Sequence, residues 1–189
     1  IISAYACLHS MKRHRSKNSA HRALKLDMMK AYDRMQWSYL EAIMKKLGFA
    51  APWLATLMKM VSTVSFSILF NGSKLEEFKP TQGIRQGDPI SPYLFLLAAE
   101  GLSCLLNSQN QSSHLGGIKV APSAPPVNHL LFADDSLLFF RASVNGAEEV
   151  SNLLNTYCMA SGQRINKDKS SIFFSKGCPQ IVRDAVKGC

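Results

Sequence analysis

The feature that most constrains the fold is a pair of adjacent carboxylates, Asp134 and Asp135, inside an otherwise apolar stretch of the chain. Apolar residues dominate both flanks, at positions 130–133 and 137–140. A stretch this apolar belongs in a protein interior, where ionised carboxylates are costly unless something neutralises them. A tight turn between two buried strands resolves the conflict, because it places both acids at its tip. The sequence therefore predicts a β-hairpin with Asp134 and Asp135 at the tip.

Two interpretations of this acidic tip remain open at this point. Like charges side by side become favourable when a divalent cation lies between them and further ligands. Asp-Asp is also an ordinary turn sequence, because Asp tolerates left-handed backbone geometry. The tip is therefore either a candidate metal site or a plain turn, and the rest of the chain must distinguish the two.

Composition favours a folded, basic protein. The chain has 189 residues, of which 47% are hydrophobic, enough for the core of one domain or of one lobe of a larger enzyme. The net charge of +9 predisposes it to phosphate-rich partners. Many of the basic residues fall into two groups: Lys12, Arg13, His14, Arg15, Lys17, His21, Arg22 and Lys25; and Arg164, Lys167, Lys169 and Lys176. These groups are either two solvated faces or two sides of a groove that follows a nucleic-acid backbone.

The cysteines and the apolar runs exclude several other classes of protein. Five scattered cysteines form no Cys-x-x-Cys pair, so neither a zinc site nor a disulfide framework is expected. Scattered cysteines of this kind are typical of proteins in a reducing, intracellular setting. No apolar run is long enough to span a bilayer, and we expect no membrane partner. No cleavable signal peptide is visible in this segment, and a first residue other than Met suggests a segment of a longer chain.

Periodicity predicts an α+β fold, with one antiparallel sheet and helices packed on one face. Strands are expected at residues 23–27, 64–70, 74–78 and 170–175, besides the acidic hairpin. Asn71-Gly72 marks the turn between the second and third of these. Helices are expected at 37–47, from Pro52 to about residue 61, from Pro92 to about residue 107, and around residues 150–157 before Gly162. Residues 107–117 are expected to form a flexible loop.

Three parts of this arrangement bear on chemistry. Asp27 ends the first strand, Asp134 lies at the hairpin tip, and a Gly- and Gln-containing loop at residues 81–92 precedes a helix. If the first strand and the hairpin are neighbours in the sheet, Asp27 and Asp134 can share a pair of Mg²⁺ ions. Hard carboxylate oxygens suit Mg²⁺, and two metal ions held by carboxylates suit phosphoryl transfer.

Four segments resemble, in order, the motifs of one known family. They are residues 24–34 (LKLDMMKAYDR), 83–92 (GIRQGDPISP), 132–135 (FADD) and 161–170 (SGQRINKDKS). The chain resembles the palm of a reverse transcriptase, most closely those of LINE-type (non-LTR) retrotransposons, and the resemblance covers nearly the whole chain.

The resemblance implies a set of catalytic residues. Asp27 and Asp134 match the metal-binding pair, and Asp135 matches the adjacent acid, which has a more supporting role. The backbone carbonyl of Met28 matches a further metal ligand, so that two Mg²⁺ ions are the expected cofactors. Lys169 matches the lysine that protonates the leaving pyrophosphate. Lys167 is the neighbouring alternative, and either side chain is otherwise a solvated charge.

The resemblance also implies substrate-binding residues. Tyr32 matches the aromatic residue beneath the incoming sugar, where a flat ring in contact leaves no room for a ribose 2′-OH; without the motif it is an ordinary core tyrosine. Gln86 and Gly87 match the loop near the nascent base pair. Glycine lets a backbone approach a substrate closely, and glutamine offers both a donor and an acceptor. The same two residues also form a plain turn before a helix.

The implied organisation is a polymerase palm with partial fingers and no thumb. Residues 1–25 are expected to form a basic segment with part of the fingers. Residues 26–176 are expected to form the palm, with a fingers-side hairpin at about 64–80, and residues 177–189 a tail or the start of a connection to a missing thumb.

The implied activity is that of an RNA-directed DNA polymerase. It adds deoxynucleotides from their triphosphates to a primer 3′-OH, with an RNA template and a DNA primer as partners. The remainder of a larger polyprotein, with fingers, thumb and possibly an endonuclease, is a further expected partner, and the expected location is the cytoplasm and nucleus.

Two alternatives remain. One is a truncated, non-catalytic retroelement remnant that acts as a basic nucleic-acid-binding module, which the basic N-terminal run and the expected lack of a thumb favour. The other is a polymerase of the related group II intron or retron type.

Overall fold

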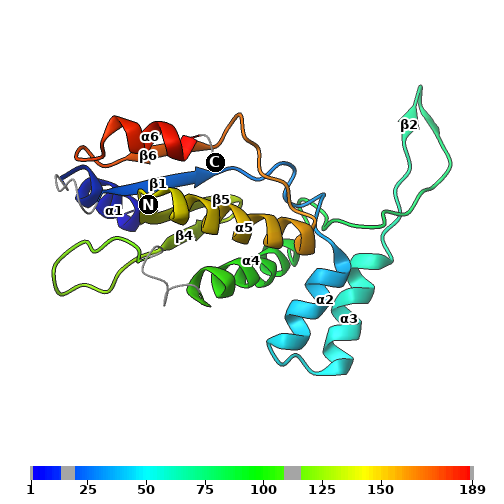
Figure 1. Cartoon of the computed structure of the whole chain (residues 1–189). Helices are drawn as coiled ribbons and strands as arrows, with labels where there is room; N and C mark the ends of the chain where they lie inside the picture. The colour runs from blue at the N-terminus through cyan, green and yellow to red at the C-terminus, as the bar shows by residue number, and fades with distance from the viewer. Residues whose placement is uncertain (1, 14–19, 109–115, 188–189) are drawn as a thin grey trace.

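The computed structural model describes residues 2–13, 20–108 and 116–187. Helices and strands are interspersed along the chain (Figure 1). The helices are α1 (Ile2–Arg13), α2 (Trp37–Lys46), α3 (Ala51–Ser62), α4 (Ser91–Ser108), α5 (Val144–Ser161) and α6 (Gln180–Lys187). The strands are β1 (His21–Leu26), β2 (Leu69–Phe70), β3 (Ser73–Lys74), β4 (His129–Phe132), β5 (Asp135–Arg141) and β6 (Ser171–Phe174).

The main sheet has the strand order β4-β5-β1-β6, and every pair in it is antiparallel. β1 pairs with β5 along its whole length, from His21 opposite Arg141 to Leu26 opposite Ser136. The acidic hairpin is therefore the direct neighbour of β1, which ends at Leu26 just before Asp27, as the expected sharing of metal ions by Asp27 and Asp134 requires. This antiparallel sheet with its helices confirms the predicted α+β class.

The two faces of the sheet pack against different helices. Leu24 and Leu26 of β1 join the main core with α4 and α5, which run along the sheet in Figure 1. Because side chains alternate along a strand, Ala23 faces the other way, and it packs with Cys7 and Met11 of α1. Most of the helical packing lies on one face, as predicted, and α1 adds a smaller core on the second face.

The hairpin between α3 and α4 is shorter in paired length than predicted. β2 and β3 have two residues each, with one further bridge between Phe66 and Phe78. The turn at Asn71-Gly72 forms as predicted, with positive φ at both residues. The hairpin projects away from α3 in Figure 1, and Leu69 and Phe70 are exposed. Because neither face of this hairpin packs against the rest of the protein, little stabilises a longer β-ladder in it.

Two helices were not predicted, and one expected boundary falls inside a strand. α1 lies in the expected basic segment, and α6 lies in the tail that periodicity left unassigned. β1 begins at His21, so residues 21–25 already belong to the sheet. The expected flexible loop falls largely on residues 109–115, outside the described residues, as do His14, Arg15 and Lys17 of the basic segment. Within the described part, no helix is both long and apolar enough to cross a membrane.

Candidate active site

The aspartates that the sequence predicts to be catalytic lie at adjacent ends of two paired strands. Asp27 follows Leu26, which is opposite Ser136 in the ladder, and Asp135 directly precedes Ser136. Asp27 is half-buried, and its backbone N–H donates to the Ser170 hydroxyl at 3.2 Å. The strand pairing therefore brings the end of the first motif beside the acidic hairpin.

The tip of the β4–β5 hairpin is a tight turn formed by Ala133 and Asp134. Phe132 pairs with Asp135 across the turn, and Ala133 has a φ of +50°. Asp134 and Asp135 are exposed, and so is the Phe132 side chain, at 73%. The hairpin prediction is confirmed. The predicted burial of the flanking strands holds for β5, whereas β4 is only half-buried and Phe132 is exposed beside the acids at the tip.

The two acids have different surroundings. The Asp135 carboxylate lies 3.4 Å from the Lys25 ammonium on β1, and both side chains are about half exposed. An exposed pair of this kind contributes between about 0 and 1 kcal/mol. Asp134 has no ion pair within the described part of the chain, and it lines a cavity instead.

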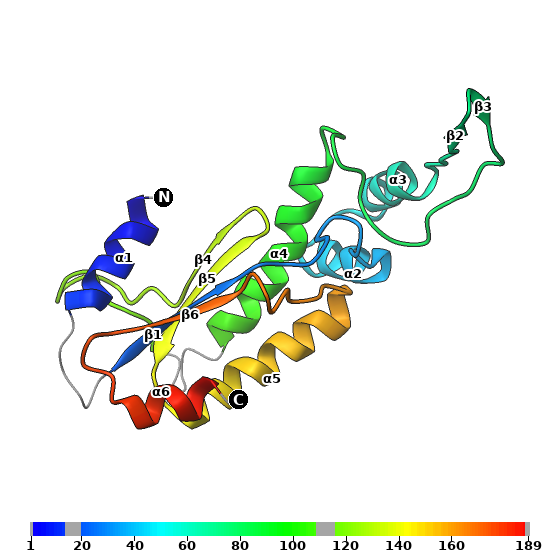
Figure 2. The same ribbon diagram turned by 90° about the horizontal axis from the view of Figure 1, so that it is seen from above.

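That cavity brings together residues from three of the four motif segments. It has a volume of about 520 Å³ and is lined by Tyr32, Gln86, Gly87, Asp88, Pro89, Pro92 and Asp134. Figure 2 shows the β4–β5 hairpin tip beside the first half of α4, which agrees with both elements lining one cavity. Tyr32, Gln86, Gly87 and Asp134 thus meet at one place, whereas Asp27, Met28 and Asp135 do not line the cavity itself.

Tyr32 is both a packed side chain and a cavity wall. Its ring stacks on Phe95 of α4, with centroids 5.1 Å apart and planes at 4°. Its carbonyl accepts a hydrogen bond from the Ile84 backbone at 2.9 Å. The side chain is half-buried and contacts the main core. Tyr32 is therefore a core residue whose ring also lines the cavity, and its contact with a sugar stays a prediction.

The loop before α4 is bonded to the turn that follows Asp27. Gly83 N–H donates to the Met35 carbonyl at 2.8 Å, and the Trp37 indole donates to the Gly83 carbonyl at 2.6 Å. Gly83 has a φ of +91°, and a Cβ there would lie 2.8 Å from the Asp33 carbonyl oxygen, so the contact excludes any larger residue. Gly87, which lines the cavity, has a φ of +85°, and this left-handed backbone conformation favours glycine.

The fourth motif segment, residues 161–170, runs beside residues 27–36 and is bonded to them at successive steps. Gly162 ends α5 in the left-handed conformation, as predicted. The bonds join Gln36 N–H to Ser161 O (2.9 Å), Arg34 Nε to Gly162 O (3.3 Å), Gln163 Nε2 to Ala31 O (2.8 Å), Met29 N–H to Arg164 O (2.7 Å) and Asn166 N–H to Asp27 O (2.9 Å). We call residues 161–166 the clasp, because they hold the first motif along its length.

The predicted lysines lie elsewhere. Lys169 is exposed in a turn just beyond the clasp, and it does not line the 520 Å³ cavity. Lys167 lines a separate cavity of about 380 Å³ between β6, α5 and α6. Proton transfer by Lys169 therefore stays a prediction from the resemblance alone.

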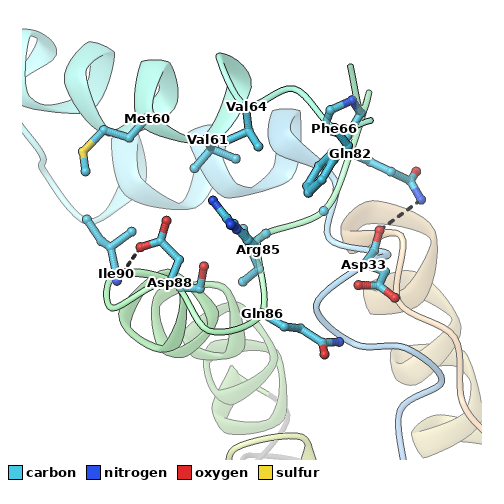
Figure 3. Close-up of a pocket in the computed structure, with 14 residues that line it drawn as sticks. Asp33, Met60, Val61, Val64, Phe66, Gln82, Arg85, Gln86, Asp88 and Ile90 are labelled. Carbon is cyan, nitrogen blue, oxygen red and sulfur yellow. Dashed lines mark hydrogen bonds between the residues drawn. The ribbon is translucent and has the colours of Figure 1, made fainter. Parts of the chain in front are cut away.

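A second cavity of about 510 Å³ adjoins the first (Figure 3). Gln86 and Asp88 line both cavities. Figure 3 shows Arg85 extending toward Val61 and Val64 at the end of α3. Phe66, at the base of the β2–β3 hairpin, forms another wall and is 38% exposed. The adjoining cavity therefore presents a cation and an aromatic ring next to the cavity of Tyr32.

The carboxylates suit a Mg²⁺ site that water and substrate phosphates complete, rather than a metal site built from protein ligands alone. Within the described residues there is no group of three or more His, Cys, Asp or Glu side chains placed to hold a metal ion. Mg²⁺ commonly takes only one or two protein carboxylates and completes its shell with water and substrate phosphates. Asp27 and the acidic tip, on paired strands, offer that kind of donor set.

Some residues of the site have no role in the sequence prediction. Gln163 is buried in the clasp, Trp37 anchors the loop before α4, and Asp88 lines the cavity and accepts a hydrogen bond from Ile90 N–H. Gln163 and Asp88 lie inside recognised motif segments, which was the available signal, whereas nothing in the sequence distinguishes Trp37 from a core residue.

Comparisons with known proteins identify the family and the fold of the chain. The family described as "Reverse transcriptase (RNA-dependent DNA polymerase)" matches residues 2–183. An uncharacterised mitochondrial protein of Arabidopsis thaliana is 48% identical over 73 residues, which are 38% of this chain and 60% of that protein. A retrovirus-related Pol polyprotein from a type-1 retrotransposable element R2 of Popillia japonica is 26% identical over 95% of this chain and 27% of its own length.

Solved structures show the same fold. Telomerase from Candida albicans, solved in complex with a fragment of telomeric RNA, matches 91% of this chain and 29% of its own with a TM-score of 0.65 and 17% identity. The chain spans only part of each of these relatives, from 27% to 60% of their length. Because the family match covers nearly every residue, the chain belongs to the reverse transcriptase family of RNA-dependent DNA polymerases.

Proposed function

We propose that this chain is the palm of a polymerase that catalyses Mg²⁺-dependent nucleotidyl transfer to a primer 3′-OH, with RNA as template. The observation that carries the proposal is the cavity that Tyr32, Gln86, Gly87 and Asp134 share, beside the strand end at Asp27. A deoxynucleoside triphosphate is the proposed occupant, since it has a sugar for Tyr32 to contact and phosphates that draw metal ions to the carboxylates.

The chain's own residues bind and orient the substrate in this proposal. The Tyr32 ring, held by its stack on Phe95, forms a flat wall that contacts the sugar and excludes a 2′-hydroxyl. Gln86 is exposed and has both a donor and an acceptor for the nascent base pair. The left-handed backbone at Gly87 lets the loop turn along the cavity without a side chain in it.

The acidic groups define where the metal ions are held. Asp27, Asp134 and Asp135, with the Met28 carbonyl, are the proposed ligands. When bound, two Mg²⁺ ions supply activation of the attacking hydroxyl and charge neutralisation at the departing pyrophosphate. Asp135 also pairs with Lys25, so one of the proposed ligands already has a cationic neighbour.

The adjoining cavity in Figure 3 is the proposed path of the template strand. Arg85 supplies a cation for a phosphate, and the partly exposed Phe66 supplies a ring on which a base can stack. Gln86 lines both cavities, so it stands between the proposed template and the proposed incoming nucleotide.

Primer extension on an RNA template tests the proposal. In the natural full-length chain, Asp134→Ala should reduce the rate on the order of a thousandfold, because it removes a ligand that stabilises developing charge. Asp184→Asn on α6, away from both cavities, is the matched control and should extend at the wild-type rate. Extension by Asp134→Ala at the rate of this control would rule the proposal out.

A second candidate function is a non-catalytic, basic nucleic-acid-binding module, which the net charge of +9 favours. It predicts salt-dependent binding to RNA or DNA that ignores both Mg²⁺ and the Asp134→Ala change, with no extension by the wild type. Failure to bind any nucleic acid at low salt would remove this candidate.

A further inference from the structure

Gln163 is a buried polar side chain at the centre of the clasp. It is 4% exposed, and its amide nitrogen donates to the Ala31 carbonyl at 2.8 Å across a long sequence separation. The amide oxygen has no hydrogen-bond partner among the described residues. A buried amide with one side unsatisfied is costly, and a purely apolar residue would fill the same space. The donor side of the amide is therefore the part that the structure uses.

The turn that receives this hydrogen bond is strained. Lys30, directly before Ala31, has a φ of +50°, in the left-handed region that residues other than glycine rarely adopt. The turn closes through Arg34 N–H, which donates to the Lys30 carbonyl at 3.1 Å. Such a conformation persists only where the surroundings hold it, and the bond from Gln163 fixes the carbonyl next to the strained residue.

The residue after Ala31 is Tyr32, the cavity wall. Its own carbonyl accepts a hydrogen bond from Ile84 N–H at 2.9 Å, and its ring stacks on Phe95. The backbone at Tyr32 is thus fixed from two directions, from the clasp through Ala31 and from the loop before α4 through Ile84. Gln163 does not line the cavity, so any effect it has there passes through this backbone.

We infer that Gln163 is a positioning residue for sugar selection, which rests on the proposed function of the cavity. Its amide holds the Lys30–Ala31 turn in the strained form that presents the Tyr32 ring to the sugar. Without the donor, the turn relaxes, the ring shifts from the cavity wall, and a ribose 2′-hydroxyl is admitted. The clasp segment therefore contributes to substrate choice as well as to the folding of the first motif.

The test compares deoxynucleotide with ribonucleotide incorporation by the natural full-length chain. Gln163→Met keeps the size of the side chain and removes the donor. We expect the ratio of kcat/KM for deoxynucleotide over ribonucleotide to fall about tenfold, the scale of one lost hydrogen bond. Ser175→Ala is the matched control, because it removes a buried hydroxyl that accepts from His21 N–H at the far end of β1. It should leave the ratio unchanged.

A double-mutant cycle shows whether Gln163 acts through Tyr32. In a Tyr32→Val background, Gln163→Met should cause no further loss of discrimination, since the ring it positions is absent. An additive loss would overturn the inference, and so would an unchanged ratio in the single variant. Both results leave the polymerase activity itself intact, so they are distinguishable from failure of the proposed function.

Hydrogen–deuterium exchange supplies a readout without catalysis. Gln163→Met should speed exchange at the Arg34 amide, which closes the strained turn, while Ser175→Ala should not. If Gln163→Met folds poorly, Gln163→Asn replaces it, because this variant keeps an amide but is one methylene too short to reach Ala31. Wild-type exchange at Arg34 in a folded Gln163→Met or Gln163→Asn variant would contradict the inference.

Discussion

At the scale of single residues, the acidic pair divides into two different environments. Asp135 lies beside the Lys25 ammonium, whereas Asp134 lines the cavity with Tyr32, Gln86 and Gly87. The sequence shows two identical side chains in adjacent positions. The difference arises from the hairpin, because Asp134 occupies the turn and Asp135 begins β5.

This difference predicts unequal effects on catalysis. Asp135→Asn should leave measurable primer extension under conditions in which Asp134→Asn gives none, because the proposal gives Asp135 the supporting role and Asp134 lines the cavity. Single-turnover extension rates of the two variants measure the contrast. Equal loss in both variants would contradict the division of roles.

At the scale of secondary-structure elements, the end of α5 sets the position of the clasp. Gly162 has a φ of +76°, and a Cβ there would lie 2.5 Å from the Arg34 carbonyl oxygen. The helix therefore ends directly against the turn that follows Asp27. This contact joins α5, a core helix, to the loop that leads into the cavity.

Gly162→Ala should consequently destabilise the fold by about 2–4 kcal/mol, through left-handed strain together with the backbone clash. Gly48→Ala is the matched control, since Gly48 has a φ of +84° but nothing within 4 Å of a Cβ. It should cost only about 1 kcal/mol. Urea denaturation of both variants measures the difference, and equal losses would show that the contact with Arg34 is not tight.

His129, the first residue of β4, makes the free energy of unfolding depend on pH. Burial lowers the pKa of His129, and Glu100 opposes this effect only in part. Below about pH 6.5, the unfolded chain therefore binds a proton at this position more readily than the folded chain, and the free energy of unfolding falls as the pH is lowered.

His129→Gln should remove this contribution. Between pH 7.5 and pH 5.5, the variant should lose less stability than the wild type, as measured by chemical denaturation at the two pH values. Asn152→Gln at an exposed position of α5, which changes no titratable group, is the control and should lose as much as the wild type. If His129→Gln lost as much stability as the wild type between the two pH values, the result would contradict this account of β4.

At the scale of the whole molecule, the sheet was predictable because its strands have strong local signals. The alternation before Asp27, the acidic hairpin and the helix before Gly162 are each marked by residues that the structure uses as expected. The paired length of the β2–β3 hairpin was not predictable from its alternation, because tertiary packing decides pairing and this hairpin has little.

The sequence predicted several residues that line the cavity, but not the hydrogen bonds that hold them in place. Tyr32, Gln86, Gly87 and Asp134 were assigned from motifs, and the structure places them at one cavity. The bond from Gln163 to Ala31 spans more than half of the chain, and no local pattern indicates such a partner. Lys169 was also assigned from a motif, but its side chain does not line the cavity, so a motif match alone does not place a residue there.

The central claim for the molecule is that the cavity beside the acidic hairpin receives the nucleotide with its sugar against Tyr32. The most direct measurement is the ratio of deoxynucleotide to ribonucleotide incorporation by the natural full-length chain and by Tyr32→Val. Tyr93→Val, at an exposed position on α4, is the control. The account predicts that the Tyr32→Val ratio falls at least about tenfold while deoxynucleotide incorporation continues, since only the 2′-hydroxyl gains room. An unchanged ratio in Tyr32→Val would contradict it.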